Sequence, residues 1–129
     1  MLKQDVLIDT DVLIDYLRDH SQAVAYLEGL EKLPSVSVIT VAELYAGVKE
    51  GDERTNLESF LDTVNIIELN DDIARMGGIF RRDYSKSHGV GLADALIAAT
   101  AKHEFCTLVT LNSKHFPMLD KILIPYQKH

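Results

Sequence analysis

The stretch DVLIDTDVLIDYL, from Asp5 to Leu17, decides the fold of this chain. Its first part, Val6–Ile8, is a short apolar run rich in β-branched residues, and such runs are typical of strands that are buried on both faces. After Asp9 the hydrophobic period changes, because the apolar residues from Val12 to Leu17 recur at helical spacing. A buried strand that runs directly into a helix predicts the beginning of an open α/β sheet.

The acidic residues after this strand differ in how easily a structural role explains them. Ligands of open α/β sheets bind beyond the carboxyl ends of the strands, and Asp9 lies at such an end. Thr10 and Asp11 are both good N-cap residues, so we interpret Asp11 as a helix cap, and Asp15, one turn later, as a solvated surface residue. Asp9 lies one residue too early to be the expected cap, and no lysine or arginine occurs near it before Arg18. Asp9 is therefore the first candidate for chemistry.

The rest of the chain alternates strand and helix patterns. Apolar or alternating runs predict four further strands, at residues 35–39, 64–69, 107–111 and 122–124. Helical patterns occur at residues 23–33, 41–51, 57–61, 71–84 and 91–104, the second of them capped by Thr40, and residues 112–117 form a loop or short helical turn. This order predicts an α/β fold with a mostly parallel sheet of four to five strands, covered by helices on both faces. With no repeat or linker in the chain, we expect one domain over residues 1–129.

Composition restricts the class of protein. The length of 129 residues and a hydrophobic content of 47% suit one domain with its own core. No apolar run approaches the roughly 20 residues of a membrane span, and the start MLKQDVL lacks an apolar segment with a cleavage site. We therefore expect a soluble, cytoplasmic protein that does not associate with membranes. The single cysteine, Cys106, precedes a predicted strand, which favours a buried, inert thiol.

The charge excludes one mode of binding. A net charge of −7 argues against nucleic-acid binding over the whole surface, because phosphates would be repelled, but it leaves room for a local basic patch. The five histidines are scattered without the spacing of a zinc site, so we interpret most of them as surface or cap residues.

Three carboxylates occur in surroundings that are too apolar for ordinary surface acids. Asp9 ends the first strand, Glu43 is embedded in VITVAELYAGV, and Asp94 is the only charge between Gly89 and Ala101. A helix that is apolar almost all round is buried, so we expect Asp94 to be buried with it, and a buried carboxylate needs a partner. The lysines and arginines lie outside these segments, and a divalent cation such as Mg²⁺ or Mn²⁺ is the simplest shared partner for several acids.

Such a cluster favours phosphoryl chemistry. A metal ion there would orient a water molecule, lower its pKa and offset charge on the phosphate, while an acid that does not bind the ion would act as base. Thr110 and Asn112 follow the fourth strand, at the same edge of the sheet as Asp9 if the strands are parallel. Each acid also has a structural alternative. Thr40 and Glu43 fit a capping box, and Asp94 lies in a first helical turn that favours negative charge. Because these alternatives would all have to hold at once, we favour the metal site.

Four segments together resemble the signature blocks of PIN domains. They are LIDTDVLIDYL at 7–17, SVITVAELYAGV at 37–48, GLADALIAATA at 91–101 and TLVTLNSKHF at 107–116. They are most similar to the small toxin ribonucleases of VapBC toxin-antitoxin pairs, and the resemblance covers nearly the whole chain. It implies an α/β/α sandwich around a parallel sheet, and a Mg²⁺- or Mn²⁺-dependent endoribonuclease.

The resemblance also assigns roles to single residues. Asp9 and Asp94 match the first and third family acids and are implied to hold the metal; Glu43 matches the second acid, and Asn112 the fourth position, where the family has an acid or an amide. His115 stands where many relatives have an aspartate, which lowers the negative charge there and leaves open whether a second metal binds. The auxiliary residues that we expect around the site are Thr10, Asp11, Thr110 and His115.

Two alternatives from other classes remain open. VLIDTDVLI also fits a haloacid-dehalogenase-like phosphohydrolase, in which Asp9 would be the nucleophile and Asp71-Asp72 the later acidic pair, but Glu43 and Asp94 would then have no role. A phospho-receiver-like signalling module has a similar length and would use Thr110 and Lys114, but its acceptor aspartate should end the middle strand. We rank both below the nuclease.

The sequence also suggests binding partners. Arg81, Arg82 and Lys86 precede the helix at 91–104, and Lys114 follows the fourth strand, which predicts a basic rim for RNA, although Arg81 and Arg82 also fit a solvated helix face. The resemblance implies an antitoxin whose tail fills the acidic site, often through an arginine. Apolar residues of the first two helices exceed what one sheet face needs and fit a homodimer or antitoxin groove, with core packing as the alternative: Tyr16, Leu17, Tyr26 and Leu30.

Overall fold

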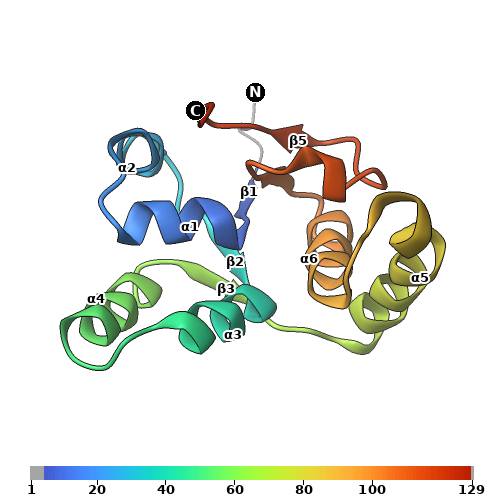
Figure 1. Ribbon diagram of the computed structural model, residues 1–129, viewed down its shortest axis with the longest axis horizontal. Helices are drawn as coiled ribbons and strands as arrows, with labels where there is room; N and C mark the ends of the chain where they lie inside the picture. Colours follow the sequence, from blue (N-terminus) through green and yellow to red (C-terminus); the bar gives the residue numbers. More distant parts are fainter. Residues whose placement is uncertain (1–4, 129) are drawn as a thin grey trace.

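A computed structural model describes residues 5–128 (Figure 1). The predictions that concern the first four residues and the fifth histidine, His129, lie outside the described residues. The strands are β1 (Val6–Ile8), β2 (Ser35–Ser37), β3 (Asn65–Ile67), β4 (Thr107–Val109) and β5 (Ile122–Leu123). The helices are α1 (Thr10–Leu17), α2 (Ser21–Glu28), α3 (Val38–Gly47), α4 (Asp52–Leu61), α5 (Asp71–His88) and α6 (Leu92–His103), and a short 3₁₀ turn, η1, spans Ser113–His115.

The five strands form one sheet in the order β3-β2-β1-β4-β5, and every neighbouring pair is parallel. This confirms the predicted α/β class and its parallel sheet. The chain adds β2 and β3 on one side of β1 and then returns to add β4 and β5 on the other side. The direction of winding therefore reverses between β1 and β4, and the crevice beyond the carboxyl ends of these two strands is the usual ligand site of such sheets.

Each face of the sheet carries its own hydrophobic core, because successive residues of a strand point to opposite faces. Leu7 of β1 and Leu108 of β4 pack with α6, whereas their neighbours Ile8 and Val109 pack with side chains of α1, α2, α3 and α4. Figure 1 shows α5 and α6 on one side of the strands and α1, α2 and α4 on the other. The predicted sandwich of helices, sheet and helices is thus confirmed.

Helix α6, which carries Asp94, is held closely against α5. The two helices approach at Gly77, where an added Cβ would lie 2.5 Å from Leu96 Cδ2. Cys106, just after α6, is buried as predicted, and this burial raises the pKa of its thiol to about 11, which suits an unreactive side chain.

Two helix starts differ from the prediction, and both lie at the carboxyl edge of the sheet. Asp9, not Thr10 or Asp11, is the N-cap residue of α1, and its carboxylate accepts a hydrogen bond from the Thr10 backbone N–H. Ser37, not Thr40, caps α3, because its hydroxyl accepts from the Ile39 N–H at 3.1 Å. The predicted strand 35–39 therefore ends at Ser37. Val38 and Ile39 suit a strand by propensity, but the cap places them in the helix.

Two predicted helix ends also lie earlier in the chain. The second helix ends at Glu28 and not near residues 32–34. Gly29 is its C-cap and still donates to the Ala25 carbonyl, but the next N–H, that of Leu30, bonds to Leu27 only three residues back. The third helix ends at Gly47 rather than at Gly51, which instead precedes α4 with a positive φ of 100°.

The interpretation of Asp15 as a solvated residue is wrong. Its side chain is buried, and its two oxygens accept hydrogen bonds from the Tyr126 hydroxyl at 2.8 Å and from Lys128 Nζ at 2.9 Å. Tyr126 also stacks on His20, with ring centroids 5.1 Å apart. The end of the chain is therefore fastened to α1 by contacts that bridge more than a hundred residues of sequence.

Candidate active site

Asp9 lies at the reversal point of the sheet, between the ends of β1 and β4. Its backbone N–H donates to the Val109 carbonyl at 2.9 Å, which continues the ladder between these two strands. One carboxylate oxygen accepts from the Thr10 N–H and the other from the Thr110 hydroxyl, both at 2.8 Å. The residue is 6% exposed. The structure thus holds this predicted site residue in one position at the place where open α/β sheets bind ligands.

Asp11 belongs to the same group, where the sequence placed it among the auxiliary residues, whereas its interpretation as a helix cap is wrong because Asp9 caps α1. Its carboxylate accepts from the backbone N–H of Val12 at 2.7 Å and of Leu111 at 3.1 Å. Since Leu111 follows β4, Asp11 fastens the first turn of α1 to the end of that strand. Thr110 completes the connection, because its hydroxyl receives the Asn112 N–H at 3.1 Å while it donates to Asp9.

Glu43 reaches the site from α3 through a hydroxyl group. The Thr10 hydroxyl donates to Glu43 Oε1 at 2.7 Å and lies 3.0 Å from the Thr40 hydroxyl. The capping-box explanation of Glu43 is wrong, because Thr40 lies inside α3 and Ser37 caps this helix. Glu43 is exposed rather than enclosed by its apolar neighbours in sequence, so its carboxylate is accessible to water. The sequence drew attention to Thr40 only as the expected cap of α3, and its place beside the Thr10 hydroxyl in the site was not predicted.

Asp94 faces the site from the first turn of α6. One of its oxygens lies 3.1 Å from His115 Nδ1, and this nitrogen lies 3.0 Å from the Asn112 amide. The Asp94 side chain is 29% exposed, so the prediction of a fully buried acid is wrong: the helix is buried along its middle, but its first turn opens to the site. The structure therefore brings Asp94, Asn112 and His115 together.

The electrostatics at Asp9 show an acid without a cationic partner. Burial is the largest cause that raises its pKa, the nearby charge of Asp11 is the next, and Asp94 adds to them; hydrogen bonds from Thr110 and Thr10 oppose the rise. The net result is a pKa of about 7. Burial likewise raises the pKa of Asp11, against the hydrogen bonds from Leu111 and Val12. Within residues 5–128, no lysine or arginine forms an ion pair with any acid of this group.

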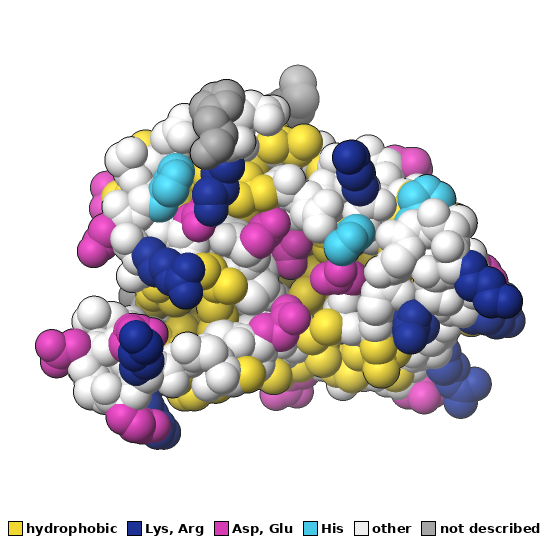
Figure 2. Space-filling model, in the orientation of Figure 1, with side chains coloured by type: hydrophobic (Ala, Val, Ile, Leu, Met, Phe, Trp, Pro, Cys, Tyr) yellow, Lys and Arg dark blue, Asp and Glu magenta, His cyan; other side chains and the backbone are white. Residues whose placement is uncertain are grey.

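This donor set fits a divalent cation. Figure 2 shows acidic side chains gathered in the middle of the face that it presents. No three acidic, histidine or cysteine side chains in the described part of the chain converge as a complete metal-binding group. Mg²⁺, however, keeps several waters and takes only one or two carboxylates directly, so Asp9 and Asp94 are residues that could hold it without a third acid. A cation would also relieve the repulsion that raises the pKa of Asp9.

The basic rim is arranged less simply than the sequence suggested. Arg81 donates to the Val90 carbonyl at 3.0 Å, and Arg82 pairs with Asp83 at 2.9 Å, so both guanidinium groups have partners within the protein. Lys86 is exposed near the end of α5. Lys114 lies on η1, next to His115. Only the last of these four residues is adjacent in sequence to a side chain that touches the acidic group.

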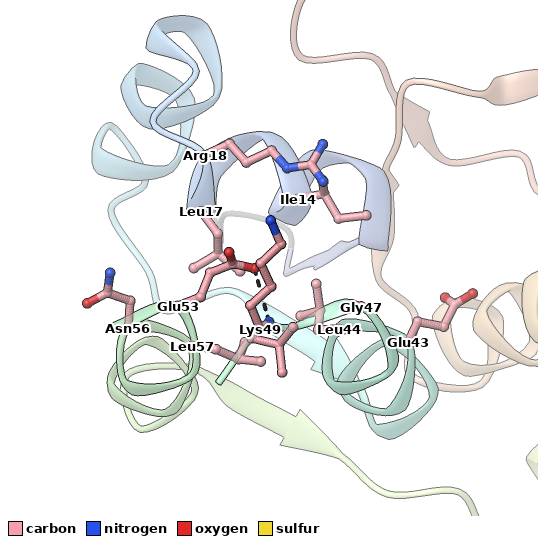
Figure 3. A pocket seen from close by; sticks show the side chains of 11 residues that line it. Ile14, Leu17, Arg18, Glu43, Leu44, Gly47, Lys49, Glu53, Asn56 and Leu57 are labelled. Carbon is pink, nitrogen blue, oxygen red and sulfur yellow. Dashed lines mark hydrogen bonds between the residues drawn. The ribbon is translucent and has the colours of Figure 1, made fainter. Parts of the chain in front are cut away.

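A groove between α1, α3 and α4 opens beside the acidic site (Figure 3). It has a volume of about 480 Å³, an apolar floor that includes Ile14, Leu17 and Leu44, and charged residues among its lining side chains. Glu43 is one of them, so the groove and the acidic site share a residue. Of the four apolar residues predicted to form a dimer or antitoxin groove, Leu17 lines this groove. Tyr16 and Leu30 line a separate, smaller pocket, and Tyr26 packs against the core.

A parallel sheet with helices on both faces and carboxylates at its reversal point defines a class of α/β proteins that bind ligands at the carboxyl edge of the sheet. Comparison with known proteins narrows this class. The chain belongs to the PIN domain family, whose model matches residues 6–122. In the described residues no helix has both the length and the apolar character of a membrane span.

Individual relatives agree with this assignment. Ribonuclease VapC19 of Mycobacterium tuberculosis is 39% identical to the chain over 125 residues, which cover 93% of this chain and 98% of that protein. Ribonuclease VapC10 of the same species is 37% identical over 94% of this chain and 92% of its own length. A toxin-antitoxin complex from Klebsiella pneumoniae contains a chain with 31% identity and a TM-score of 0.83, with 96% of this chain and 100% of that chain covered.

Family membership excludes the two alternatives from other classes. The acidic pair that a haloacid-dehalogenase-like enzyme would require, Asp71 and Asp72, is exposed and lies near Arg75 and His103, at 2.9 Å and 4.0 Å respectively. The receiver-like alternative fails because the strand that is third in sequence, β3, is followed by Asn70, the cap of α5, and the buried aspartate Asp9 follows the first strand instead.

Proposed function

We propose that this chain is a metal-dependent endoribonuclease and the toxin of a toxin-antitoxin pair. The observation that carries the proposal is the acidic site itself: Asp9, buried without a cationic partner, lies with Asp11, Glu43 and Asp94 at the reversal point of the sheet. The family and the relatives named as VapC ribonucleases support RNA as the substrate. We infer that the protein acts in the cytoplasm, where such a substrate is found.

Asp9 and Asp94 are the residues that would hold Mg²⁺ or Mn²⁺. The bound ion would supply Lewis acidity toward a phosphodiester oxygen and lower the pKa of a coordinated water. Thr110 and the Thr10 N–H hold the Asp9 carboxylate in place, so its position does not depend on the ion. His115 orients Asp94 from the other side of the site, through a hydrogen bond that Nδ1 donates when it carries the ring proton.

Glu43 is suited to accept a proton from the attacking water. Its carboxylate is exposed, and the Thr10 hydroxyl anchors one of its oxygens at 2.7 Å, which leaves the other available to water. A general base needs this combination of a fixed position and access to the reacting proton.

The antitoxin is the partner that the solved relatives suggest. The relatives from Klebsiella pneumoniae and from Rickettsia felis, the latter at 27% identity and a TM-score of 0.75, are described as a toxin-antitoxin complex and as VapBC2 bound to a promoter DNA fragment. In this chain an amphipathic segment of an antitoxin would fit the groove of Figure 3, because the groove has an apolar floor and charged residues at its edge. A segment bound there would lie beside Glu43 and would obstruct the acidic site. We also propose that the protein forms a homodimer.

The substitution Glu43→Gln tests the enzymatic role. Since Ser37 caps α3, the change removes no helix cap, and Gln can still accept the Thr10 hydroxyl; we expect a free energy of unfolding within about 1 kcal/mol of the wild type. An amide cannot take a proton from water, so cleavage of a structured RNA with Mn²⁺ should fall by a factor on the order of 10² or more. Urea unfolding and single-turnover cleavage measure the two effects.

The control is Glu28→Gln, which makes the same chemical change at an exposed position on α2. It should cleave RNA as the wild type does. If Glu43→Gln also cleaved at the wild-type rate, Glu43 would not be the base and the catalytic acids would be reduced to Asp9 and Asp94. If the wild type failed to cleave any RNA with Mg²⁺ or Mn²⁺, the proposed function would be wrong.

A further inference from the structure

A second, polar pocket lies next to the acidic site, on the side of α5. It has a volume of about 550 Å³ and is open to solvent. The lining comes from the end of α5, from the turn η1 and from a proline two residues after that turn: Ser87, His88, Ser113, Lys114, His115 and Pro117. Five of these six side chains are polar or basic. On the corresponding side of the acidic group, Figure 2 shows histidine and basic side chains at the surface.

Lys114 is the cation of this pocket, and its charge is available for a ligand. Several other basic residues are paired within the protein, as Arg54 is with Glu50 and Arg75 with Asp71. Lys114 has no ion pair or side-chain hydrogen bond within residues 5–128, although the protein carries a net charge of −7. An unpaired ammonium group in an acidic protein is a specific attraction for an anion, because the rest of the surface repels it.

The pocket and the acidic site share His115 and are connected by hydrogen bonds. His115 lines the pocket and also lies 3.1 Å from the Asp94 carboxylate. The segment that enters η1 is held by the Asn112 N–H, which donates to the Thr110 hydroxyl, and Thr110 in turn donates to Asp9. A group bound in the pocket is therefore held at a fixed position relative to Asp9 and Asp94, the two proposed metal ligands.

We propose that this pocket binds a backbone phosphate of the RNA, next to the phosphodiester bond that is cut. This inference rests on the proposed function and gives the substrate a defined second contact. Lys114 supplies the charge and the Ser113 hydroxyl a neutral hydrogen bond, a combination that suits the oxygens of a phosphodiester. The Ser87 hydroxyl lies 2.7 Å from His88 Nδ1 and donates a second hydrogen bond to the phosphate when that nitrogen carries its proton. None of the described residues that line the pocket has a carboxylate or amide side chain that would hydrogen-bond the edge of a base, so the pocket fits the backbone rather than a base.

Of the basic rim predicted from the sequence, the proposed contact retains only Lys114. Arg81 and Arg82 are occupied by Val90 and Asp83, and neither residue lines the pocket. The pocket thus assigns the phosphate contact to Lys114 and to two serines for which the sequence had no signal.

The test is a binding scan in which the RNA and the protein are changed together. A short single-stranded RNA that contains the mapped cleavage site is titrated without divalent metal, so that it is not cut, and each phosphate in turn is replaced by a neutral methylphosphonate. For the wild type we expect one position beside the cleaved bond to weaken binding roughly tenfold. For Lys114→Ala we expect weaker binding of the unmodified RNA and no further loss at that position.

The salt dependence gives a second readout. Removing one phosphate contact from a single-stranded complex should reduce the slope of log K against log salt by about 0.7. Ser87→Ala combined with Ser113→Ala should weaken binding by a few-fold without changing this slope, because no charge is lost. The control is Lys121→Ala, an exposed lysine that precedes β5 and so lies at the opposite edge of the sheet; it should bind RNA as the wild type does.

The outcomes separate this inference from the proposed function. If the wild type cleaves RNA but Lys114→Ala binds with unchanged affinity and salt slope, the phosphate site is wrong and the ribonuclease remains. If inorganic phosphate competes for the pocket while the methylphosphonate scan is flat, the pocket is a general anion site and the RNA contact is wrong. If the wild type cleaves no RNA, the proposed function fails first and this inference fails with it.

Discussion

Asp9 and Asp15 lie near opposite ends of α1 and are buried to nearly the same extent, at 6% and 7% exposure, yet their pKa values move in opposite directions. Burial raises the pKa of both. At Asp15 the hydrogen bonds from Lys128 and Tyr126 and the charge of Lys128 outweigh burial, so its pKa lies below the ordinary value. At Asp9 the closest charge is another carboxylate, and the pKa rises to about 7.

The difference between the two residues is one of partner, not of depth. Asp15 lies near the carboxyl end of α1, where the helix dipole disfavours a negative charge, and the chain supplies Lys128 to neutralise it. Asp9 caps the amino end, where the dipole favours a negative charge, but it faces other acids. A buried acid whose chain supplies its own cation stabilises the fold, and one that lacks it is suited to bind a cation from outside.

The largest expected effect follows from neutralising Asp9. Because the pKa of Asp9 is raised on folding, its negative charge lowers the free energy of unfolding. This destabilisation is complete above about pH 7 and is absent below the ordinary pKa of 3.8. Metal-free Asp9→Asn should therefore be more stable than the wild type above neutral pH, by up to about 4 kcal/mol, and this advantage should vanish as the pH falls toward 4. Urea unfolding across this pH range measures it.

Addition of Mn²⁺ should change the free energy of unfolding of the wild type and of Asp9→Asn differently. The ion should stabilise the wild type, because it binds only the folded protein, and should have little effect on Asp9→Asn. A variant that was less stable than the wild type at every pH would contradict the assignment of Asp9 as an acid without a partner.

Neutralising Asp15 should have the opposite sign. Because the pKa of Asp15 is lowered, its charge stabilises the fold above the ordinary value of 3.8 and this contribution is lost as the pH falls through the folded-state pKa. Asp15→Asn should lose about 2 kcal/mol at neutral pH, since the charge-assisted bond from Lys128 is removed, and should match the wild type in strong acid. The same unfolding series measures this, with Asp120→Asn, an exposed aspartate, as control.

The smallest expected effect belongs to Tyr126. The substitution Tyr126→Phe keeps the ring stacked on His20 but removes the hydroxyl that donates to Asp15 at 2.8 Å. A loss of about 1 kcal/mol is expected, since Lys128 still neutralises the carboxylate. Thermal melts at neutral pH measure it. A loss as large as that of Asp15→Asn would mean that the hydroxyl, and not the lysine, carries the stabilisation.

The sequence by itself determined the class of fold and the position of Asp9. Short apolar strands and amphipathic helices are local patterns, and their alternation leaves few topologies open. The end of a buried strand is likewise visible in one stretch of sequence, so an acid placed there could be recognised before the structure. The segments with Glu43 and Asp94 were found through their apolar neighbours, and both side chains do face the site, although each is more exposed than those neighbours suggested.

Only the tertiary structure decided which acids have partners. Asp15 and Lys128 are separated by 113 residues, and Asp11 and Leu111 by 100, so no local pattern contains these pairs. The caps of α1 and α3 are Asp9 and Ser37, where the sequence predicted Thr10 or Asp11 and Thr40. Neighbouring polar residues have nearly equal preference for a cap, so the packing of each helix on the sheet selects one of them. The pocket of Ser87, Ser113 and Lys114 joins two turns that are distant in the sequence, and it exists only because α6 brings the end of α5 next to the turn after β4.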